Sequence, residues 1–300
     1  MRNKNSLSTS GRPETDTKIV RGHISAGTVV ALVGMLIALA FFLLPLYWVL
    51  VSSLKDDGQL FSVNGLAVAM PIHLLSNLKT LFQFAQGAFA HWFLNSVFYG
   101  AMIAVGATFV AAMTGYAFAK FRFPLRRFWF FVLLGTITVP ATALVLPIYL
   151  LMQNLHLINT YWGVILPSLF NPFGIYLMRV FWTQGFPDEL IEAAYLDGAN
   201  DWYIFTKLGL PMVSGGLATV GLVTFVGAWN RFFLPLVILS KSRLYPLTLG
   251  LEVWNSDIMG LGIPYSAVIT GAMLSIFPLV LAYFFLQRYW QSGLTLGSNR

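Results

Sequence analysis

Long apolar stretches without ionisable side chains recur along the chain, separated by short polar segments. Six of them contain no Asp, Glu, Lys, Arg or His: 24–54, 92–119, 128–155, 157–178, 208–230 and 258–287. A helix that crosses a bilayer needs about 20 consecutive, mostly apolar residues. The pattern therefore predicts an all-α membrane protein with six transmembrane helices, the first at 24–54 and the other five within 92–287.

Two apolar features need an interpretation of their own. The 208–230 stretch continues past Arg231 as far as residue 240, and a shorter stretch at 60–70 is interrupted by polar residues. We expect 60–70 to be a loop at the membrane interface, within an extracytoplasmic segment at 55–91. The first stretch is much longer than the roughly 7–15-residue apolar region of a cleaved signal peptide, so we expect it to remain in the mature protein.

The composition supports a membrane protein. The chain is 57% hydrophobic and only 10% charged, whereas soluble domains are roughly 45–50% apolar and about 25% charged. These values exclude an ordinary soluble domain, and the 16% content of aromatic residues excludes a disordered chain. Because the chain has no cysteine, a disulfide scaffold, an iron–sulfur cluster and a thiol nucleophile are excluded as well.

The basic residues predict the orientation of the chain in the membrane. With six spans, 13 of the 18 Lys and Arg residues fall on the side that holds the N-terminus. Cytoplasmic loops carry an excess of Lys and Arg, so both termini are expected in the cytoplasm, with tails at 1–23 and 288–300. The net charge of +7 is then a consequence of topology, and no nucleic-acid partner is expected.

Catalytic chemistry and ion coupling find little support in the sequence. The six stretches contain no Asp or Glu, and the chain has no G-x-x-x-x-G-K-[ST] loop for a nucleotide. Ion-coupled carriers usually need ionisable residues at membrane depth. The four histidines lie outside the spans and are too dispersed for a metal site. We therefore predict no catalytic residue and no metal or other cofactor in this chain, and energy for uphill transport must come from another chain.

The 183–211 segment breaks the charge pattern, because it has a net charge of −4 on the side predicted to be cytoplasmic. A proline followed by two acidic residues predicts a short helix at 187–196, since the N-terminus of a helix favours anions. Gly198 predicts the end of this helix, because glycine readily adopts the left-handed conformation. Asn200 is a candidate cap for a second short helix that ends near residue 211.

The segment also carries a recognisable motif. Its residues are Glu192, Ala193, Ala194, Asp197, Gly198, Ala199, Trp202, Phe205, Leu210 and Pro211. Further matches follow at 227–230, 233–236 and 287–289. Together these residues resemble permease subunits of bacterial ABC importers, in the branch that imports carbohydrates, whose motif is the EAA loop. The resemblance covers roughly 92–297 and includes the six-span layout of the smaller, G-type permease of the maltose transporter family.

The resemblance implies a type I ABC importer permease fold in which a short helix of the EAA loop seats in a cleft of an ATPase subunit. Transferred to this chain, the contact residues would be Glu192, Ala193, Ala194, Asp197, Gly198 and Ala199. Leu210 and Pro211 would anchor the loop to the fifth span. The alternative is an amphipathic helix lying on the membrane surface, but such helices favour Lys and Arg on the polar face, and this one lacks them.

The same resemblance implies partners and a location in the bacterial plasma (inner) membrane. A second, related permease would complete the channel as a heterodimer, an ATPase dimer would hold ATP and Mg²⁺, and an extracytoplasmic solute-binding protein would deliver the solute. This chain would be a non-catalytic subunit that imports a carbohydrate, such as a neutral or acidic oligosaccharide, by alternating access. The alternatives are a permease for a non-sugar solute such as glycerol phosphate, and an ion-coupled secondary carrier.

Trp229, Asn230 and Arg231 are candidates for contact with the pathway, the solute or a partner. Members of the carbohydrate branch usually have Glu or Asp after Trp-Asn, so Arg231 reverses the local charge. At 1.5 Å per residue, Arg231 would lie roughly 25 Å along the fifth span, in the outer part of the membrane core. Two interpretations stay open: a snorkelling or partner-paired arginine without solute contact, and a contact with an anionic solute.

Aromatic residues near the ends of the predicted spans suggest interface anchors. Trp and Tyr are enriched at both membrane–water interfaces. The four tryptophans in such positions are Trp92, Trp162, Trp254 and Trp290. We expect each of them to lie at an interface rather than against a solute.

Overall fold

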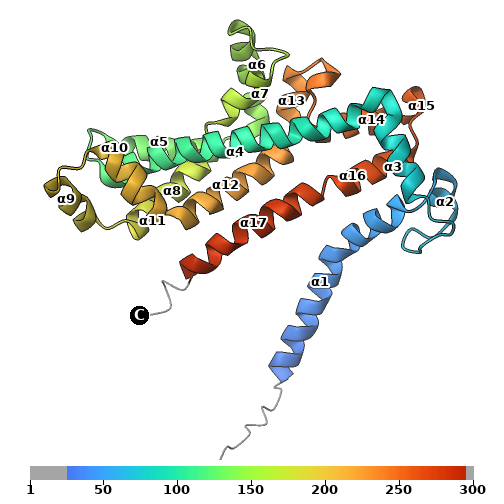
Figure 1. Cartoon of the computed structure of the whole chain (residues 1–300), viewed down its shortest axis with the longest axis horizontal. Coiled ribbons are helices and arrows are strands. Elements are labelled where there is room, and N and C mark those ends of the chain that lie inside the picture. Colours follow the sequence, from blue (N-terminus) through green and yellow to red (C-terminus); the bar gives the residue numbers. More distant parts are fainter. Residues whose placement is uncertain (1–25, 295–300) are drawn as a thin grey trace, which may run out of the picture. The chain divides into compact units, whose positions relative to one another are not determined.

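The computed structural model describes residues 26–294, in which every regular element is a helix (Figure 1). The chain divides into two compact units, Met1–Leu46 and Tyr47–Arg300. Helix α1 (Ala26–Ser53) belongs to both. The helices up to the middle of the chain are α2 (Asp57–Ser62), α3 (Leu74–Gln83), η1 (Phe84–Gly87), α4 (Ala88–Lys120), α5 (Arg126–Ile137), η2 (Ala141–Leu144), α6 (Val145–Asn154), α7 (Tyr161–Ser168) and α8 (Pro172–Gly185).

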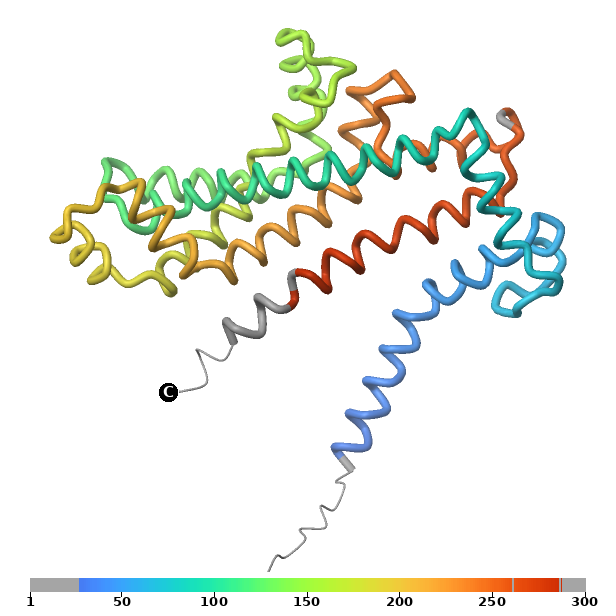
Figure 2. Tube along the Cα trace, in the orientation of Figure 1, coloured from blue at the N-terminus to red at the C-terminus, as the bar shows by residue number. Residues whose placement is uncertain are grey.

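The rest of the chain continues as short and medium helices (Figure 2). They are α9 (Asp188–Leu196), α10 (Asp201–Tyr203), η3 (Ile204–Gly209), α11 (Leu210–Met212), α12 (Ser214–Trp229), α13 (Phe233–Ile238), η4 (Ser242–Leu244), α14 (Leu247–Ser256), α15 (Ile258–Leu261), α16 (Tyr265–Leu274) and α17 (Phe277–Leu294). The prediction of an all-helical protein is confirmed for the described residues.

The first unit consists, in its described part, of most of α1. This helix passes through Pro45 without a break, and its Gly27–Ser53 portion is long and apolar enough to cross a membrane. Within the predicted first span at 24–54, residues 26–53 are helical. The predicted tail at 1–23 lies outside the described residues.

Helices α4, α8 and α12 form the centre of the second unit. Their buried residues pack into a cluster that includes Ala111, Ala112, Tyr116, Ile175, Met178, Trp182 and Val220. Helices α4 and α8 approach each other closely at Gly115, where an added Cβ atom would lie 2.8 Å from the backbone nitrogen of Arg179. Small residues allow this kind of close helix crossing in membranes, so Gly115 determines the distance between the two helices.

A second buried cluster lies where α14 and α16 pack against α3 and α4. Trp92 and Trp254 are only 2% and 3% exposed, and their ring centroids are 4.5 Å apart. The expectation that these two tryptophans are interface anchors is wrong, because helices from distant parts of the sequence cover them. Trp162 is 49% exposed, and the side chain of Trp290 lies outside the described residues.

Three of the predicted spans are bent helix pairs rather than straight helices. Helices α5 and α6 are bent by 100°, α7 and α8 by 44°, and the Asp201–Met212 run and α12 by 79°. Counting each pair as one span gives up to six membrane-crossing segments among the described residues. The sequence predicted the apolar stretches but not the breaks. Pro140 and Pro172 lie at two of these breaks. Proline lacks the N–H that continues a helix, which favours a break at these positions.

Two helices extend beyond the predicted spans. Helix α4 begins at Ala88 rather than 92, and α17 continues to Leu294 rather than ending at 287, so the predicted tail at 288–300 starts as helix. Its last six residues, 295–300, lie outside the described part. The predicted loop at 55–91 contains α2 and α3. It is tied to the end of α1 by the buried Lys55, whose Nζ donates to the Asn64 carbonyl at 2.8 Å.

Candidate functional site

The acidic 183–211 segment forms the predicted arrangement of helix, turn and helix, at one end of the second unit (Figure 1). Helix α9 begins at Asp188, and Pro187 is its N-cap rather than its first helical residue. Asp188 and Glu189 lie in the first turn, where the helix dipole stabilises negative charge. The second helix, Asp201–Met212, contains a π-helical turn.

The turn between these helices is built as the sequence indicates. Gly198 has a φ of +79°, in the left-handed region. The Gly198 N–H donates to the Tyr195 carbonyl at 3.0 Å, and the Ala199 N–H donates to the Ala194 carbonyl at 2.9 Å, which satisfies the end of α9. The Asn200 side chain accepts from the Tyr203 N–H at 2.8 Å. The predicted glycine stop and asparagine cap are both confirmed.

Most of the candidate contact residues share one surface. Ala194 is 7% exposed and belongs to the core cluster, whereas Glu192, Ala193 and Asp197 are exposed. A hollow of about 470 Å³ adjoins the turn. We call the surface formed by Glu192, Ala193, Ala194, Asp197, Gly198 and Ala199 the α9 surface. Ala194, Asp197, Gly198 and Ala199 line this hollow, and Glu192 and Ala193 are exposed on the helix that leads to it.

The α9 surface is acidic. Glu189, Glu192, Asp197 and Asp201 are exposed, and within the described residues none of these four forms an ion pair. The Tyr195 hydroxyl donates to the Asp201 carboxylate, and this hydrogen bond raises the pKa of Tyr195. The charge of these four residues is thus presented to solvent rather than neutralised inside the chain.

The start of α9 is attached directly to the core helices. Lys120, the last residue of α4, has a side chain only 6% exposed, and its Nζ donates to the Phe186 carbonyl and to Asp188. On α8, the Trp182 Nε1 donates to the Ala112 carbonyl of α4 at 2.9 Å. Sequence reasoning missed Lys120. The available signal was a basic residue ending a span on the same predicted side as the acidic segment.

The predicted anchor residues lie on α11. Leu210 is partly buried and packs against the core cluster, whereas Pro211 is exposed. The chain bends by 79° between the Asp201–Met212 helix and α12, beside the buried Val213. Of the two residues, Leu210 has the contacts with which an anchor can act on the core.

The second group of candidates, Trp229, Asn230 and Arg231, does not share one site in the structure. Trp229 is 2% exposed, and its ring lies 5.9 Å from those of Phe93 and Phe225. The prediction that Trp229 faces the pathway is therefore wrong, because these core contacts shield it. Asn230 is exposed and its side chain donates to the Val226 carbonyl of its own helix at 2.9 Å. Only Arg231 of the three reaches a cavity.

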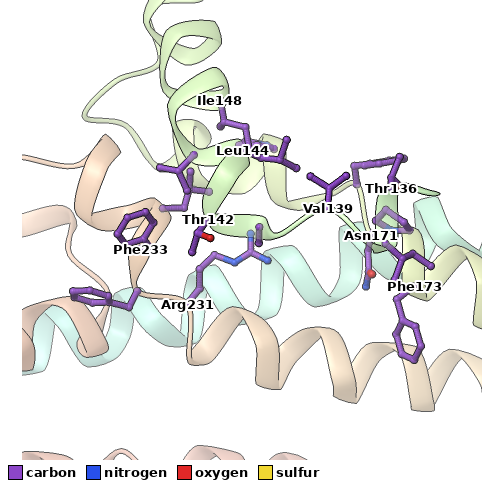
Figure 3. A pocket seen from close by; sticks show the side chains of 17 residues that line it. Thr136, Val139, Thr142, Leu144, Ile148, Asn171, Phe173, Arg231 and Phe233 are labelled. Atoms are coloured by element: carbon purple, nitrogen blue, oxygen red, sulfur yellow. The ribbon is translucent and has the colours of Figure 1, made fainter. Parts of the chain in front are cut away.

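Arg231 lies in the short break between α12 and α13, not within a long helix as predicted. Its guanidinium donates to the Ser168 hydroxyl at the end of α7. It projects into a cavity of about 510 Å³ that is also lined by residues near the α5–α6 and α7–α8 breaks (Figure 3). Ser168 was not predicted as a site residue, since it is one of many serines in the chain and lies in an apolar stretch.

The described residues contain no group of three or more His, Cys, Asp or Glu side chains arranged to hold a metal ion. The acidic side chains of the 183–211 segment spread along an exposed helix and turn rather than converging on a point. What the arrangement supports is contact with another macromolecule at the α9 surface and contact with a solute at the Arg231 cavity.

Comparison with known proteins identifies the family. Residues 107–295 match the family described as the binding-protein-dependent transport system inner membrane component. The chain belongs to this family. It is therefore a non-catalytic membrane subunit of an ABC transporter located in the bacterial inner membrane, and the ATPase is a separate chain. Such a subunit works with another permease, an ATPase and a solute-binding protein.

Known relatives align with this inner membrane component over most of its length. The arabinooligosaccharides transport system permease protein AraQ of Halalkalibacterium halodurans is 32% identical and aligns over 84% of this chain and 89% of its own. The diacetylchitobiose uptake system permease protein NgcG of Streptomyces coelicolor is 31% identical, over 86% and 84% of the two chains. The sn-glycerol-3-phosphate transport system permease protein UgpE of Yersinia pestis is 30% identical, over 87% and 93%.

A solved structure shares the fold. It is that of a bacterial ABC transporter involved in the import of the acidic polysaccharide alginate, with a TM-score of 0.74 and 24% sequence identity. The alignment covers 87% of this chain and 95% of that chain. The predicted type I ABC importer permease fold is thereby confirmed.

Proposed function

We propose that this inner membrane component forms half of the translocation pathway of an ATP-driven carbohydrate importer and receives the energy of ATP hydrolysis through its α9 surface. The observation that carries the proposal is the acidic helix–turn–helix, whose carboxylates are exposed while its apolar side, including Ala194, Ile204 and Phe205, packs into the core cluster. ATP and Mg²⁺ would be bound by the ATPase subunit, and this chain would move between inward-facing and outward-facing states.

The attachments of α9 give a physical route for the coupling. Lys120 connects the first turn of α9 to α4, and Phe186, which precedes α9, is fully buried in the core cluster. At the other end, Leu210 packs against the core before the bend into α12. A displacement of α9 by an ATPase subunit would therefore be passed to α4 and α12 rather than absorbed by a flexible loop.

The competing role for α9, a helix lying on the membrane surface, is disfavoured by charge. Surface helices carry Lys and Arg on the polar face, and the cytoplasmic leaflet is itself negatively charged. The exposed charges of α9 are Glu189 and Glu192, together with Asp188, which pairs with Lys120. Such a surface would be repelled by anionic lipids and suits a protein partner with basic groups.

The solute class rests on the relatives. Two of them are named for arabinooligosaccharides and diacetylchitobiose, and both cover more than four-fifths of the chain. A carbohydrate, and in particular an oligosaccharide, is therefore the proposed cargo. Glycerol phosphate is the second candidate, because a permease named for it is 30% identical over 87% of the chain.

The proposed partners are a second, different permease, an ATPase dimer and an extracytoplasmic solute-binding protein. Arg231 and the other residues of its cavity would belong to this chain's half of the pathway. The second permease would supply the facing half. Solute would reach the channel from the binding protein, with Asn230 and Arg231 as candidates for contact on this chain.

The absence of cysteine allows a direct test of the α9 surface. A single Ala193→Cys variant is co-expressed with the genomically neighbouring transporter subunits and then labelled with a bulky maleimide. We expect labelling to abolish co-purification of the ATPase and uptake of arabinooligosaccharide. The matched control is Ser62→Cys on α2, which is also exposed. Normal uptake and ATPase retention after complete labelling at position 193 would refute the proposal.

A further inference from the structure

The Arg231 cavity lies where three interrupted helix pairs meet. Its lining includes residues beside the α5–α6 break, the α7–α8 break and the α12–α13 break (Figure 3). Within a bilayer, non-helical backbone is tolerated only where it is buried in protein or lines a water-filled cavity. Three breaks that line one cavity fit the second of these two conditions.

The depth of the cavity follows from helix lengths. Helices α5, α8 and α12 contain 12, 14 and 16 residues, which corresponds to about 18–24 Å at 1.5 Å per residue. Helix α8 ends just before α9 and α12 begins just after α11, while the far ends of both helices lie at the cavity. If these helices run along the membrane normal from the α9 side, the cavity lies well over halfway across a hydrocarbon core of about 30 Å.

The cavity contains one cation without a matching anion. Arg231 is the sole charged residue among those that line it, and no carboxylate of the described residues lies within 4.0 Å of its guanidinium. A buried charge is costly unless it is paired. Arginine stays protonated and has five N–H donors. One nitrogen donates to Ser168, which leaves other N–H groups able to bind a ligand in the cavity.

Ser168 holds the guanidinium rather than contacting the ligand as a donor. Its side chain is buried, and its hydroxyl proton is donated to the Val164 carbonyl at 2.6 Å. The Ser168 oxygen can therefore only accept from Arg231. This fixed hydrogen bond orients Arg231 and reduces the conformational freedom that it would lose on binding an anion.

The rest of the lining suits the body of a sugar. Phe170, Phe173 and Phe233 are exposed and line the same cavity, as does Thr142 (Figure 3). Aromatic rings offer apolar faces to the C–H faces of a sugar ring, and a volume of about 510 Å³ is within the roughly 300–1,000 Å³ of small-molecule pockets.

We propose that the Arg231 cavity is a subsite for an anionic group on the transported solute, either the carboxylate of an acidic sugar or a phosphate ester. Arg231 would bind the anion, Ser168 would position Arg231, and the phenylalanines would contact the carbon skeleton. This inference rests on the proposed function, because it takes the cavity as part of the pathway. It adds a charge preference that neither the fold nor the coupling surface requires.

The test uses the complete transporter and exploits the absence of native cysteine in this chain. Arg231→Cys is compared with wild type for uptake of a uronic acid disaccharide, sn-glycerol 3-phosphate and neutral arabinobiose. Thiol reagents then attach either an aminoethyl group, which restores a positive charge, or a sulfonatoethyl group, which adds a negative one. Arg243→Cys is the matched control, because Arg243 is exposed and lines a different cavity.

We expect wild type to import at least one of the two anionic solutes, and which one it imports distinguishes carboxylate from phosphate. Arg231→Cys should lower that uptake about tenfold to a hundredfold, as for the loss of a hydrogen bond to a charged group. The aminoethyl group should restore uptake and the sulfonatoethyl group should not, while Arg243→Cys stays normal.

Two results would overturn the anion subsite. One is import of arabinobiose but neither anionic solute by wild type; the other is an equal loss of anionic and neutral uptake in Arg231→Cys with no recovery by the aminoethyl group. The second result would indicate that Arg231 instead pairs with a carboxylate of the second permease. Wild-type uptake of none of the sugars would refute the proposed carbohydrate function itself, which keeps the two failures distinct.

Discussion

The Nζ atom of Lys120 lies 2.6 Å from a carboxylate oxygen of Asp188, which joins the last residue of α4 to the first turn of α9. The two partners differ in exposure: the lysine side chain is 6% exposed and the aspartate side chain 76%. The Lys120 Nζ also donates to the Phe186 carbonyl. A core helix is therefore attached to the acidic surface by one buried cation.

Replacement of Lys120 by methionine should uncouple ATP hydrolysis from transport. The substitution keeps the length of the side chain but removes the bond to Asp188 and leaves the Phe186 carbonyl without its donor, at a cost of about 1–3 kcal/mol. We expect solute uptake to fall several-fold while ATPase activity of the assembled complex persists, measured in proteoliposomes. Lys207→Met, at an exposed lysine of the acidic 183–211 segment, is the control. Unchanged uptake per ATP hydrolysed in Lys120→Met would contradict this role.

Substitution at Gly198 separates backbone strain from contact with a partner. An added Cβ atom meets nothing within 4 Å in this chain, but the φ of +79° is unfavourable for most residues. Asparagine tolerates this conformation better than valine. If a partner covers Gly198, both Gly198→Asn and Gly198→Val should impair ATPase binding in a pull-down assay. Normal binding by Gly198→Asn together with loss in Gly198→Val would show that only the turn geometry matters.

Gly115→Ala should destabilise the bundle. The new methyl group would lie 2.8 Å from the Arg179 backbone nitrogen and from the Met178 Cβ atom, so α4 and α8 must separate, at about 1–3 kcal/mol. Thermal unfolding in detergent, followed by tryptophan fluorescence, should show a lower midpoint. In Gly135→Ala on α5 the methyl group meets nothing within 4 Å, and a midpoint equal to or above wild type is expected there. Equal midpoints in the two variants would argue against close packing at Gly115.

The hydrogen bond between Tyr195 and Asp201 should make the turn sensitive to strongly alkaline pH. The bond raises the pKa of Tyr195, so its contribution is fully present below the ordinary tyrosine value of about 10 and is lost as the pH rises through the higher value in the folded chain. We expect Tyr195→Phe to speed amide exchange at Ala199 and Asn200 at neutral pH. Phenylalanine cannot ionise, so an alkaline increase in local mobility, read by a spin label on Leu196→Cys, should appear in wild type and be absent in Tyr195→Phe.

Local sequence signals were sufficient for the elements that depend on neighbouring residues. The apolar stretches predicted the spans because bilayer burial depends on composition over about 20 residues. Gly198 and Asn200 predicted the turn of the acidic segment, since a left-handed stop and a side-chain cap involve residues only three or four positions apart. The resemblance in the same segment then predicted a partner-contact surface there, which stays a prediction.

The tertiary structure alone decided which side chains lie together. Lys120 meets Asp188 across 68 residues of sequence, and Arg231 meets Ser168 across 63. Trp229, expected at the pathway, is buried because α4 covers it. Hydropathy averages over a window and does not specify where a helix breaks or what packs against it. The sequence by itself therefore determined the permease family and the acidic helix–turn–helix, and it predicted six spans and a coupling role for that segment. The three-dimensional packing decided that Arg231 faces a cavity.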